Sequence, residues 1–456
     1  MEIATNSRGQ WGSRFGFILA AAGSAVGLGN IWRFPYTTGQ NGGGAFVLLY
    51  VLCTAFIGLA VMWAELAIGR ATQRSPVSAF KLLAPGSIWK IVGYLGILTG
   101  IGILSYYGVV AGWTVGYLVY GFLGKLSTGD PGKLFGGFVT NWPLQLVYLA
   151  MFMALTMLVV LGGVRKGIER LTKVLMPLLL LMLIGLIING MLQPKASAGL
   201  SYYLTPDFSK VTGMTFVYAL GQAFFSLSLG MGAMLTYGSY IRKQENLASA
   251  GAYVVVFDTL VALMAGLMIF PILGGAPKSA GPGLVFVVLT KQFQAMPAGN
   301  VVAIMFFSLL AIAALTSTVS LLEVVTSFMV DEWKLKRKTS VLLSGTVIAL
   351  IGIPSALSLG GVKWLSALYT VEGKPQGFLD LMNFIFGNVL LAVGALLTCL
   401  FVVLRWKTKN AIQEIGRGAP WFRLLETPWK IAVAVLCPLA VLGLLLYMAI
   451  TGKALG

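Results

Sequence analysis

Residues 23–35 read GSAVGLGNIWRFP and lie within the first long apolar run of the chain. Three glycines, Asn30, Arg33 and Pro35 in one run oppose a continuous helix through a membrane. Non-helical backbone at membrane depth persists only where other groups satisfy its polar atoms. Carbonyl groups freed at a break can bind a cation, and amide groups at the start of a half-helix can bind an anion. The stretch therefore predicts a broken membrane helix with a ligand site. A glycine-rich packing face is the alternative, but it leaves Asn30 and Arg33 unexplained.

The composition of the whole chain is that of a membrane protein. Of its 456 residues, 58% are hydrophobic and only 10% are charged, whereas about 25% of the residues in a soluble domain are charged. The chain has no histidine, which excludes a histidine base and a histidine-bound metal. Cys53, Cys399 and Cys437 lie in apolar runs, where packing is the expected role. Because no nucleophile–base pair or metal cluster is evident, the sequence does not favour a membrane-embedded enzyme.

Long apolar runs between charged or Pro- and Gly-rich breaks predict an all-α polytopic membrane protein with about eleven helices. The expected spans are 12–37, 42–70, 88–123, 143–162, 167–191, 213–241, 247–274, 296–331, 340–358, 376–404 and 429–450. The longest outer loops are expected at about 124–141 and 275–295. The charged stretch at about 405–428 predicts an inner loop with room for a surface helix. The whole chain, 1–456, is expected to be one transmembrane domain.

The basic residues predict the orientation. Lys and Arg total 32 against 14 Asp and Glu, a net charge of +18. With the N-terminus in the cytoplasm, most of the basic residues fall in inner segments, as in other membrane proteins. The odd number of helices then places the C-terminus outside. Topology accounts for the charge excess, so nucleic-acid binding is not predicted. The first apolar run begins near Phe15, and no cleavable signal peptide is evident.

A second candidate break lies in residues 221–240, GQAFFSLSLGMGAMLTYGSY. Gly230 and Gly232 flank Met231, and Ser226 and Ser228 come just before them. Interrupted helices at corresponding places in two halves of a chain are the best sequence indicator of a transporter's central site. Helices 1–5 (about 12–191) and 6–10 (about 213–404) are thus expected to form two inverted repeats. The helix at about 429–450 is an addition.

One face of the eighth helix also offers oxygen atoms to a cation. Ala313, Thr316 and Ser317 stand at positions i, i+3 and i+4 and share that face. A carbonyl and two hydroxyls are ligands that a hard cation accepts. Taken alone this signal is weak, because Ser and Thr commonly hydrogen-bond to their own helix.

Three carboxylates, Glu65, Asp258 and Glu323, stand at membrane depth. A charge there costs several kcal/mol, on the order of 3 or more, unless it is paired. Asp258 has no basic neighbour one turn away, so a bound cation or a proton is its expected counter-charge. Glu65 and Glu323 can instead be hydrogen-bonded structural groups.

The motifs together resemble the neurotransmitter:sodium symporter family. The quoted run at 23–35 is followed by NGGGAF at 41–46 and MWAELAIGR at 62–70, and then by GQAFFSLSLG, LTSTVSLLEV and VDEWKLKRK. The resemblance covers nearly the whole chain and is strongest to the bacterial branch, in particular to transporters of several hydrophobic amino acids. It implies a leucine-transporter-like fold of five plus five helices with helices 1 and 6 broken. It also implies sodium-coupled amino-acid uptake across a bacterial cytoplasmic membrane.

The resemblance implies two sodium sites and a substrate site. The first sodium ion would meet the Ala25 carbonyl and the side chains of Asn30, Ser226 and Asp258. The second would meet the carbonyls of Gly23, Val26 and Ala313 and the hydroxyls of Thr316 and Ser317. The residues implied for substrate binding are Ala25, Leu28, Gly29, Ile103, Tyr107, Phe225, Ser226, Ser228, Met231, Ser317 and Leu321. Since the pocket is apolar, aliphatic and aromatic L-amino acids are the expected substrates.

Gates follow from the same resemblance. Arg33 and Gln222 would lie above the substrate, and Asp380 is the expected partner of Arg33, because Asn383 occupies the position where the family often has an acid. On the inner side, Arg8 and Asp331 would form a salt bridge near Tyr240. Gly167 and Pro177 match a spacing that the family links to unwinding of helix 5 and release of the second sodium ion; a static kink is the alternative.

The carboxylate of Asp258 predicts a chloride-independent transporter, since the resemblance implies that chloride-dependent members carry neutral residues there. A proton could also occupy Asp258 on the empty return step. A proton-coupled amino-acid transporter on the same fold is the alternative function. A channel is disfavoured by the occluding pair of Tyr107 and Phe225. Membrane lipid is the expected surrounding, and the oligomeric state stays open.

Overall fold

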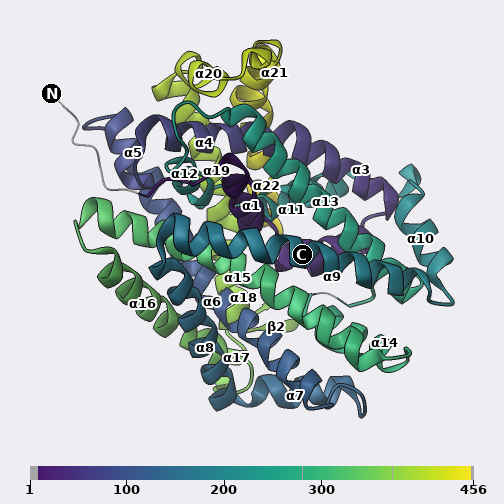
Figure 1. Cartoon of the computed structure of the whole chain (residues 1–456). Helices are drawn as coiled ribbons and strands as arrows, with labels where there is room; N and C mark the ends of the chain where they lie inside the picture. The colour runs from purple at the N-terminus through teal and green to yellow at the C-terminus, as the bar shows by residue number, and fades with distance from the viewer. Residues whose placement is uncertain (1–8, 280, 372, 453–456) are drawn as a thin grey trace.

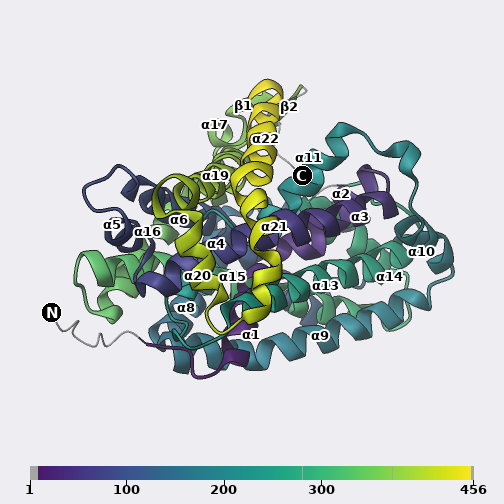
Figure 2. The same ribbon diagram turned by 90° about the horizontal axis from the view of Figure 1, so that it is seen from above.

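The computed structural model describes residues 9–279, 281–371 and 373–452, and the molecule it shows is a bundle of helices (Figure 1). In both views α5 (Pro76–Leu83) lies at the left and α10 (Ala196–Leu204) at the right, with α9 (Arg170–Met191) running between these ends (Figure 2). Within the described residues, nine helices are long and apolar enough to cross a membrane. A tenth span is a helix pair bent by 56° at a short break.

The unbroken spans agree with the predicted ranges to within a few residues, except that the last one begins at Pro420, nine residues earlier than predicted. They are α3–η2–α4 (Gly44–Thr72), α6 (Lys90–Phe122), α8 (Trp142–Leu161), η3–α9 (Val164–Met191), α13 (Leu247–Leu273), α15 (Gly299–Glu332), α16 (Arg337–Leu357), α18–η6–α19–η7 (Phe378–Trp406) and η8–α21–η9–α22 (Pro420–Thr451). The labels η2, η3, η6, η7 and η9 mark single π-helical turns within these spans.

Both predicted breaks are confirmed. The first span consists of α1 (Arg14–Ala25), a π-helical turn η1 (Gly29–Arg33) and α2 (Phe34–Gln40). The sixth consists of α11 (Gly213–Ser226) and α12 (Ala233–Gly238), with non-helical residues 227–232 between them. Helices thus occupy every predicted range, although α11 and α12 are not among the helices long and apolar enough to cross a membrane by themselves. The all-α polytopic fold is confirmed.

The core forms around α15 and α6, which pack against each other along most of their length. Small residues allow the close approach: a β-carbon on Gly121 of α6 would lie 2.7 Å from Ile304 of α15. Apolar side chains on the outer helices point away from the bundle. Leu181 of α9 is 67% exposed and Leu446 of α22 is 62% exposed, as expected for surfaces that meet lipid.

Short elements in the loops were not predicted. Residues 124–141 contain α7 (Pro131–Thr140), residues 275–295 contain η5 (Gly283–Leu289) and α14 (Thr290–Gln294), and a hairpin pairs β1 (Tyr369–Val371) with β2 (Lys374–Gln376). Aromatic packing attaches the first two loops to each other. Phe286 of η5 stacks on Phe135 of α7, with ring centres 5.3 Å apart. Such contacts join distant parts of the chain, so no local sequence pattern predicts them.

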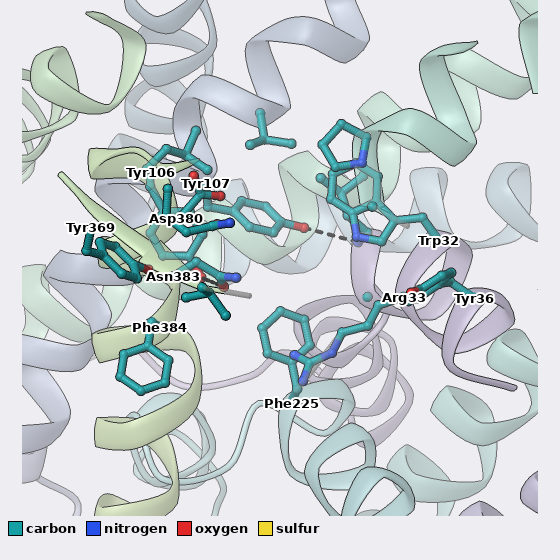
Figure 3. A pocket seen from close by; sticks show the side chains of 18 of the residues that line it. Trp32, Arg33, Tyr36, Tyr106, Tyr107, Phe225, Tyr369, Asp380, Asn383 and Phe384 are labelled. Carbon is teal, nitrogen blue, oxygen red and sulfur yellow. Dashed lines mark hydrogen bonds between the residues drawn. The ribbon is translucent and has the colours of Figure 1, made fainter. Parts of the chain in front are cut away.

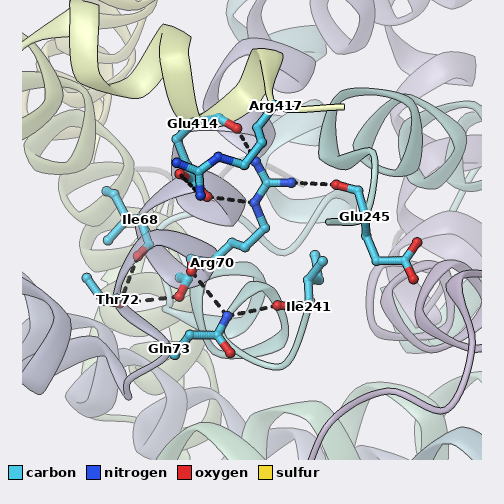
Figure 4. Close-up of polar contacts among 9 residues, drawn as sticks. Ile68, Arg70, Thr72, Gln73, Ile241, Glu245, Glu414 and Arg417 are labelled. Atoms are coloured by element: carbon cyan, nitrogen blue, oxygen red, sulfur yellow. Dashed lines mark hydrogen bonds and ion pairs between the residues drawn. The ribbon is translucent and has the colours of Figure 1, made fainter. Parts of the chain in front are cut away.

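The predicted surface helix of the stretch 405–428 is α20 (Thr408–Gly416). Arg70 of α4 attaches it to the bundle. The fully buried Arg70 guanidinium donates to Glu414 Oε1 over 2.7 Å, to the Glu414 carbonyl, and to the Glu245 carbonyl over 2.6 Å (Figure 4). A buried charge needs such complete pairing, and this one joins α4, α20 and the connection that follows α12.

Candidate functional site

The two broken helices meet at the centre of the molecule. The Ser228 hydroxyl, in the break of the sixth span, donates to the Ser24 carbonyl of α1 over 3.0 Å. Ser228, Gly230 and Gly232 all have positive φ angles, 54°, 83° and 74°, which helical residues do not adopt. A β-carbon on Gly230 would collide with the Leu391 carbonyl of α19. The break is therefore held open by both its own backbone and its neighbour.

A carboxylate cluster lies beside the breaks. Asn30 Nδ2 donates to Asp258 Oδ1 over 2.8 Å and to Ser226 Oγ over 2.9 Å, and Ser226 Oγ donates to Asp258 Oδ2 over 2.7 Å. All three residues are buried. The structure thus brings together the side chains predicted for the first sodium site, and Ala25 lines the same inner cavity as Asn30 and Ser226. This oxygen-rich donor set suits a hard cation.

Tyr50 is a member of this cluster that the sequence did not reveal. Its hydroxyl donates to Ser226 Oγ over 3.2 Å, and its ring is fully buried. Tyr50 stands in an apolar run of α3 (Gly44–Leu52), where a tyrosine is indistinguishable from a packing residue.

A second group of oxygens lies where the end of α1 meets α15. Ser317 Oγ is 3.2 Å from the Ala313 carbonyl and 3.4 Å from both the Ser24 and Val26 carbonyls. Thr316 Oγ1 donates to the Ala313 carbonyl over 3.0 Å. The α-carbon of Gly23 faces the same place, because a β-carbon there would lie 3.3 Å from Thr316 Cβ. The residues predicted for the second sodium site therefore converge. The Ser24 carbonyl, which was not predicted, joins them.

An inner cavity of about 40 Å³ lies between these two oxygen groups. It is lined by Ser24, Ala25, Gly27, Gly29, Asn30, Ile103, Tyr107, Phe225, Ser226, Ser228, Met231, Ser317, Leu321 and Leu391. Every residue predicted for substrate binding is among them except Leu28, whose amide donates to Tyr107 Oη over 3.1 Å. Among these described lining residues, only the four serines, Asn30 and Tyr107 have polar side chains. Leu391 of α19 was missed, since an aliphatic residue in a long apolar helix gives no signal.

A larger outer cavity of about 440 Å³ lies above the inner one. Gly29, Tyr107 and Phe225 line both cavities and separate them. The guanidinium of Arg33 lies over the Phe225 ring, 4.5 Å from its centre (Figure 3). Gln222 Nε2 donates to the Gly29 carbonyl over 3.2 Å. These are the positions expected of an outer gate.

The expected pairing of Arg33 with Asp380 stays a prediction. Both residues line the outer cavity, but Asp380 accepts a hydrogen bond from Gly377 N over 2.9 Å at the start of α18 (Phe378–Met382). Arg33 donates to Asn388 Oδ1 over 3.3 Å. Asn388 was not predicted, because it lies in the π-helical turn η6 (Asn383–Leu390), which shifts the face that its side chain takes.

A second group of polar contacts lies where the segment after α12 meets the second half of α15 and the start of α16. Tyr240 Oη donates to Glu323 Oε1 over 2.6 Å, and Arg337 pairs with both oxygens of the same carboxylate over 3.0 and 2.5 Å. Asp331 accepts from Ser75 N over 2.7 Å. Arg8, the predicted partner of Asp331, lies outside the described residues. The Glu323–Arg337 pair was missed, since its members belong to successive helices, α15 and α16.

The inner connection before α5 adds a second ion pair at this end. Lys81 of α5 pairs with Glu332, the last residue of α15. Its hydrogen bond to that carboxylate raises the pKa of the Lys81 ammonium. Together with Asp331, this pair holds α5 against the end of α15.

Helix 5, which is η3 followed by α9, contacts α1 through both of these elements. Gly167 lies in the π-helical turn η3 (Val164–Glu169), and Pro177 lies inside α9. Met176 Sδ is 3.1 Å from the position of a β-carbon on Gly23, so the residue before the proline touches the second oxygen group. The helix is continuous here, with Pro177 inside it, and its predicted unwinding stays a prediction.

Three comparisons with known proteins bear on this site. A family model described as "Sodium:neurotransmitter symporter family" matches residues 8–135 and 137–456. An uncharacterised sodium-dependent transporter of Bacillus subtilis, YhdH, is 38% identical over 95% of this chain and 96% of its own length. The sodium-dependent serotonin transporter of Drosophila melanogaster is 31% identical over 81% of this chain and 67% of its own.

A solved structure is also similar. The crystal structure of MhsT in complex with L-phenylalanine has a TM-score of 0.87 and 43% sequence identity, and the match covers 96% of this chain and 99% of that one.

Proposed function

The chain belongs to the sodium:neurotransmitter symporter family, and from this premise we propose that it imports hydrophobic L-amino acids together with two sodium ions. It is a sodium-dependent transporter of the membrane and not an enzyme. In the proposed cycle, sodium and substrate bind from outside, the outer gate closes, and both leave to the cytoplasm. The N-terminus would face the cytoplasm of a bacterial cell and the C-terminus the outside.

The observation that carries the proposal is the position of Tyr107 and Leu28 beside the Asp258 cluster. The Leu28 amide and the Tyr107 hydroxyl, 3.1 Å apart, both present donors that a substrate carboxylate could accept from. A sodium ion held by Asn30, Ser226 and Asp258 would lie next to that carboxylate. Opposite charges in a buried site attract strongly, so sodium and substrate would each raise the affinity for the other.

The side-chain end of the inner cavity supports hydrophobic substrates. Ile103, Phe225, Met231 and Leu321 line it, and a charged substrate side chain would find no counter-charge among them. MhsT, the similar solved structure, holds L-phenylalanine. Because the cavity measures only about 40 Å³, a large substrate requires the lining to rearrange. Met231 has an unbranched, flexible side chain suited to this, and its glycine neighbours let the backbone follow.

The driving force would come from both ions. Each charge that crosses contributes about 2.3 kcal/mol per 100 mV of membrane potential, in addition to its concentration gradient. The second ion would bind at Thr316 and Ser317, in contact through Gly23 with Met176 of α9. Loosening of helix 5 at Gly167 and Pro177 would then open a path for that ion toward the cytoplasm.

The Asp258 carboxylate supports chloride independence. Its two oxygens accept hydrogen bonds from Asn30 and Ser226, so the negative charge beside the first sodium site belongs to the protein itself. A separate anion is then not required for charge balance.

The test is binding of labelled leucine and labelled tryptophan to the purified chain. Sodium is compared with potassium at equal ionic strength, and chloride with gluconate. Sodium-dependent, chloride-indifferent binding of both amino acids is the expected result. Binding that follows pH and ignores sodium would overturn the proposal in favour of the proton-coupled alternative. If neither amino acid binds, the assignment of the inner cavity as the substrate pocket is overturned.

A further inference from the structure

A surface cavity of about 290 Å³ lies where helix 5 begins, remote from the substrate site. It is lined by Gly12, Arg165, Glu169, Arg170, Lys173 and Val174. Three of these side chains are cations and one is a carboxylate. All but Gly12 come from η3 and α9, and Gly12 belongs to the segment that leads into α1.

The single carboxylate is already fully used. Glu169 is only 2% exposed and accepts from Gly12 N over 2.6 Å, from Ser13 Oγ over 3.2 Å and from Lys173 Nζ over 2.6 Å. Among the residues that the structure describes, neither Arg165 nor Arg170 has an ion-pair partner. The cavity therefore presents two uncompensated guanidinium groups beside a lysine. Guanidinium groups match the oxygen geometry of phosphate.

The position of the cavity identifies the source of the phosphate. Val174, one of its walls, is 63% exposed, and one and two turns further along α9 Leu178 and Leu181 are 42% and 67% exposed. These apolar side chains form a surface that meets lipid tails. The cavity thus stands at the border between this surface and the end of the span, where lipid headgroups lie.

We propose that Arg165, Arg170 and Lys173 bind the phosphate of an anionic phospholipid whose acyl chains follow the exposed face of α9. The excess of cations selects an anionic headgroup over a zwitterionic one, whose own amine would meet the same guanidinium groups. A free phosphate ion shares the headgroup chemistry but would gain nothing from the apolar face.

The bound lipid would also favour one conformation of the transporter. The cavity has walls from two elements, and Glu169 joins them through Gly12 and Ser13. If the start of α1 moves away from α9, one wall is lost. A ligand that binds one conformation better shifts the population toward it. Under the proposed function, sodium binding also favours the state in which α1 closes the inner side, so anionic lipid and sodium would strengthen each other's binding.

The test uses the full chain in nanodiscs of phosphatidylcholine alone or with phosphatidylglycerol. The double variant Arg165→Gln/Arg170→Gln is compared with Lys336→Gln/Lys338→Gln, which removes the same charge from two exposed lysines at the start of α16. Lipid retained by the purified protein is measured by mass spectrometry, and sodium half-saturation by leucine binding. A third arm adds millimolar inorganic phosphate to the phosphatidylcholine discs.

The wild type and the lysine control are expected to retain phosphatidylglycerol selectively, and the arginine variant to lose it. In the wild type and the lysine control, phosphatidylglycerol should lower the sodium concentration that gives half-maximal leucine binding about fivefold, which is at the low end of typical coupling between sites. In the arginine variant this concentration should stay constant. Equal retention in all three proteins would overturn the site. If inorganic phosphate reproduces the effect, the lipid assignment is wrong.

If the wild type retains phosphatidylglycerol selectively but its sodium concentration for half-maximal leucine binding does not change, the coupling between lipid and sodium is wrong. If the wild type shows no sodium-dependent leucine binding in any disc, the proposed function fails, but lipid retention still decides the present inference.

Discussion

At the scale of single residues, the site depends on groups that would be unstable in a membrane without one another. Asp258, Asn30 and Ser226 come from three spans and satisfy each other's polar atoms. Each was recognisable in the sequence because a polar residue in an apolar run needs a reason. Tyr50 and Leu391 were not recognisable, since their side chains are ordinary in a membrane helix. Site residues that are unusual in an apolar helix can therefore be identified from the sequence, whereas site residues that are common in such a helix cannot.

Replacement of Asp258 by Asn tests the source of the negative charge. Removing one charged member of a buried network costs about 1–3 kcal/mol, so sodium affinity in gluconate should fall about 10- to 100-fold. Chloride should restore part of it. Leucine binding as a function of sodium, in each anion, measures this, with Asp207→Asn at the surface as control. Full activity of Asp258→Asn in gluconate would contradict the role of the carboxylate.

Gly230→Ala tests the backbone of the second break. A β-carbon there meets the Leu391 carbonyl, and alanine is strained at a φ angle of 83°, so a cost of about 1–3 kcal/mol is expected. The matched control is Gly443→Ala in α22, where a β-carbon has open space. Thermal unfolding with and without leucine measures both. A variant at 230 as stable as the control would show that the break tolerates a side chain.

At the scale of elements, the sequence predicts the long spans because an apolar run of that length has one interpretation in a membrane. It does not predict α7, η5 or α14, whose apolar residues are too few for a span and pack against one another and against α6 and α15. The π-helical turns were also missed. One of them, η6, contains Asn388, whose side-chain oxygen accepts a hydrogen bond from Arg33.

The proline inside helix 5 carries a prediction of its own. Pro177→Ala restores a helix hydrogen bond and favours the continuous helix by about 3 kcal/mol. If helix 5 must loosen for the second ion to leave, uptake into vesicles should fall several-fold while sodium-dependent leucine binding persists. Pro354→Ala, inside α16, is the control for a proline with no contact to α1. Equal uptake by the wild type and Pro177→Ala would favour a static kink.

At the scale of the whole molecule, the two breaks and their surroundings form one unit because segments distant in sequence converge on it. The order of spans and the correspondence of the two breaks could be predicted from the chain. The gates could be predicted only in part. The Glu323–Arg337 pair and the attachment of α20 by Arg70 depend on how helices pack, and no spacing in the sequence encodes that.

The orientation of the molecule is testable because all three cysteines are buried and should not react with a membrane-impermeant maleimide. Ser127→Cys, before α7, and Lys336→Cys, before α16, are both exposed positions. With the N-terminus inside, intact cells should label only the cysteine at 127, and both should react after lysis. Labelling of position 336 in intact cells would reverse the topology.

The Ser24 carbonyl has a consequence for energy conservation in the cell. This single oxygen accepts a hydrogen bond from the hydroxyl of Ser228, which lines the proposed substrate cavity, and lies 3.4 Å from the hydroxyl of Ser317 in the proposed second sodium site. Movement of either Ser228 or Ser317 would therefore change the contacts of the same carbonyl oxygen. Under the proposed function, passage of ions without cargo would disturb both contacts at once, so this oxygen would help to prevent leakage of the sodium gradient.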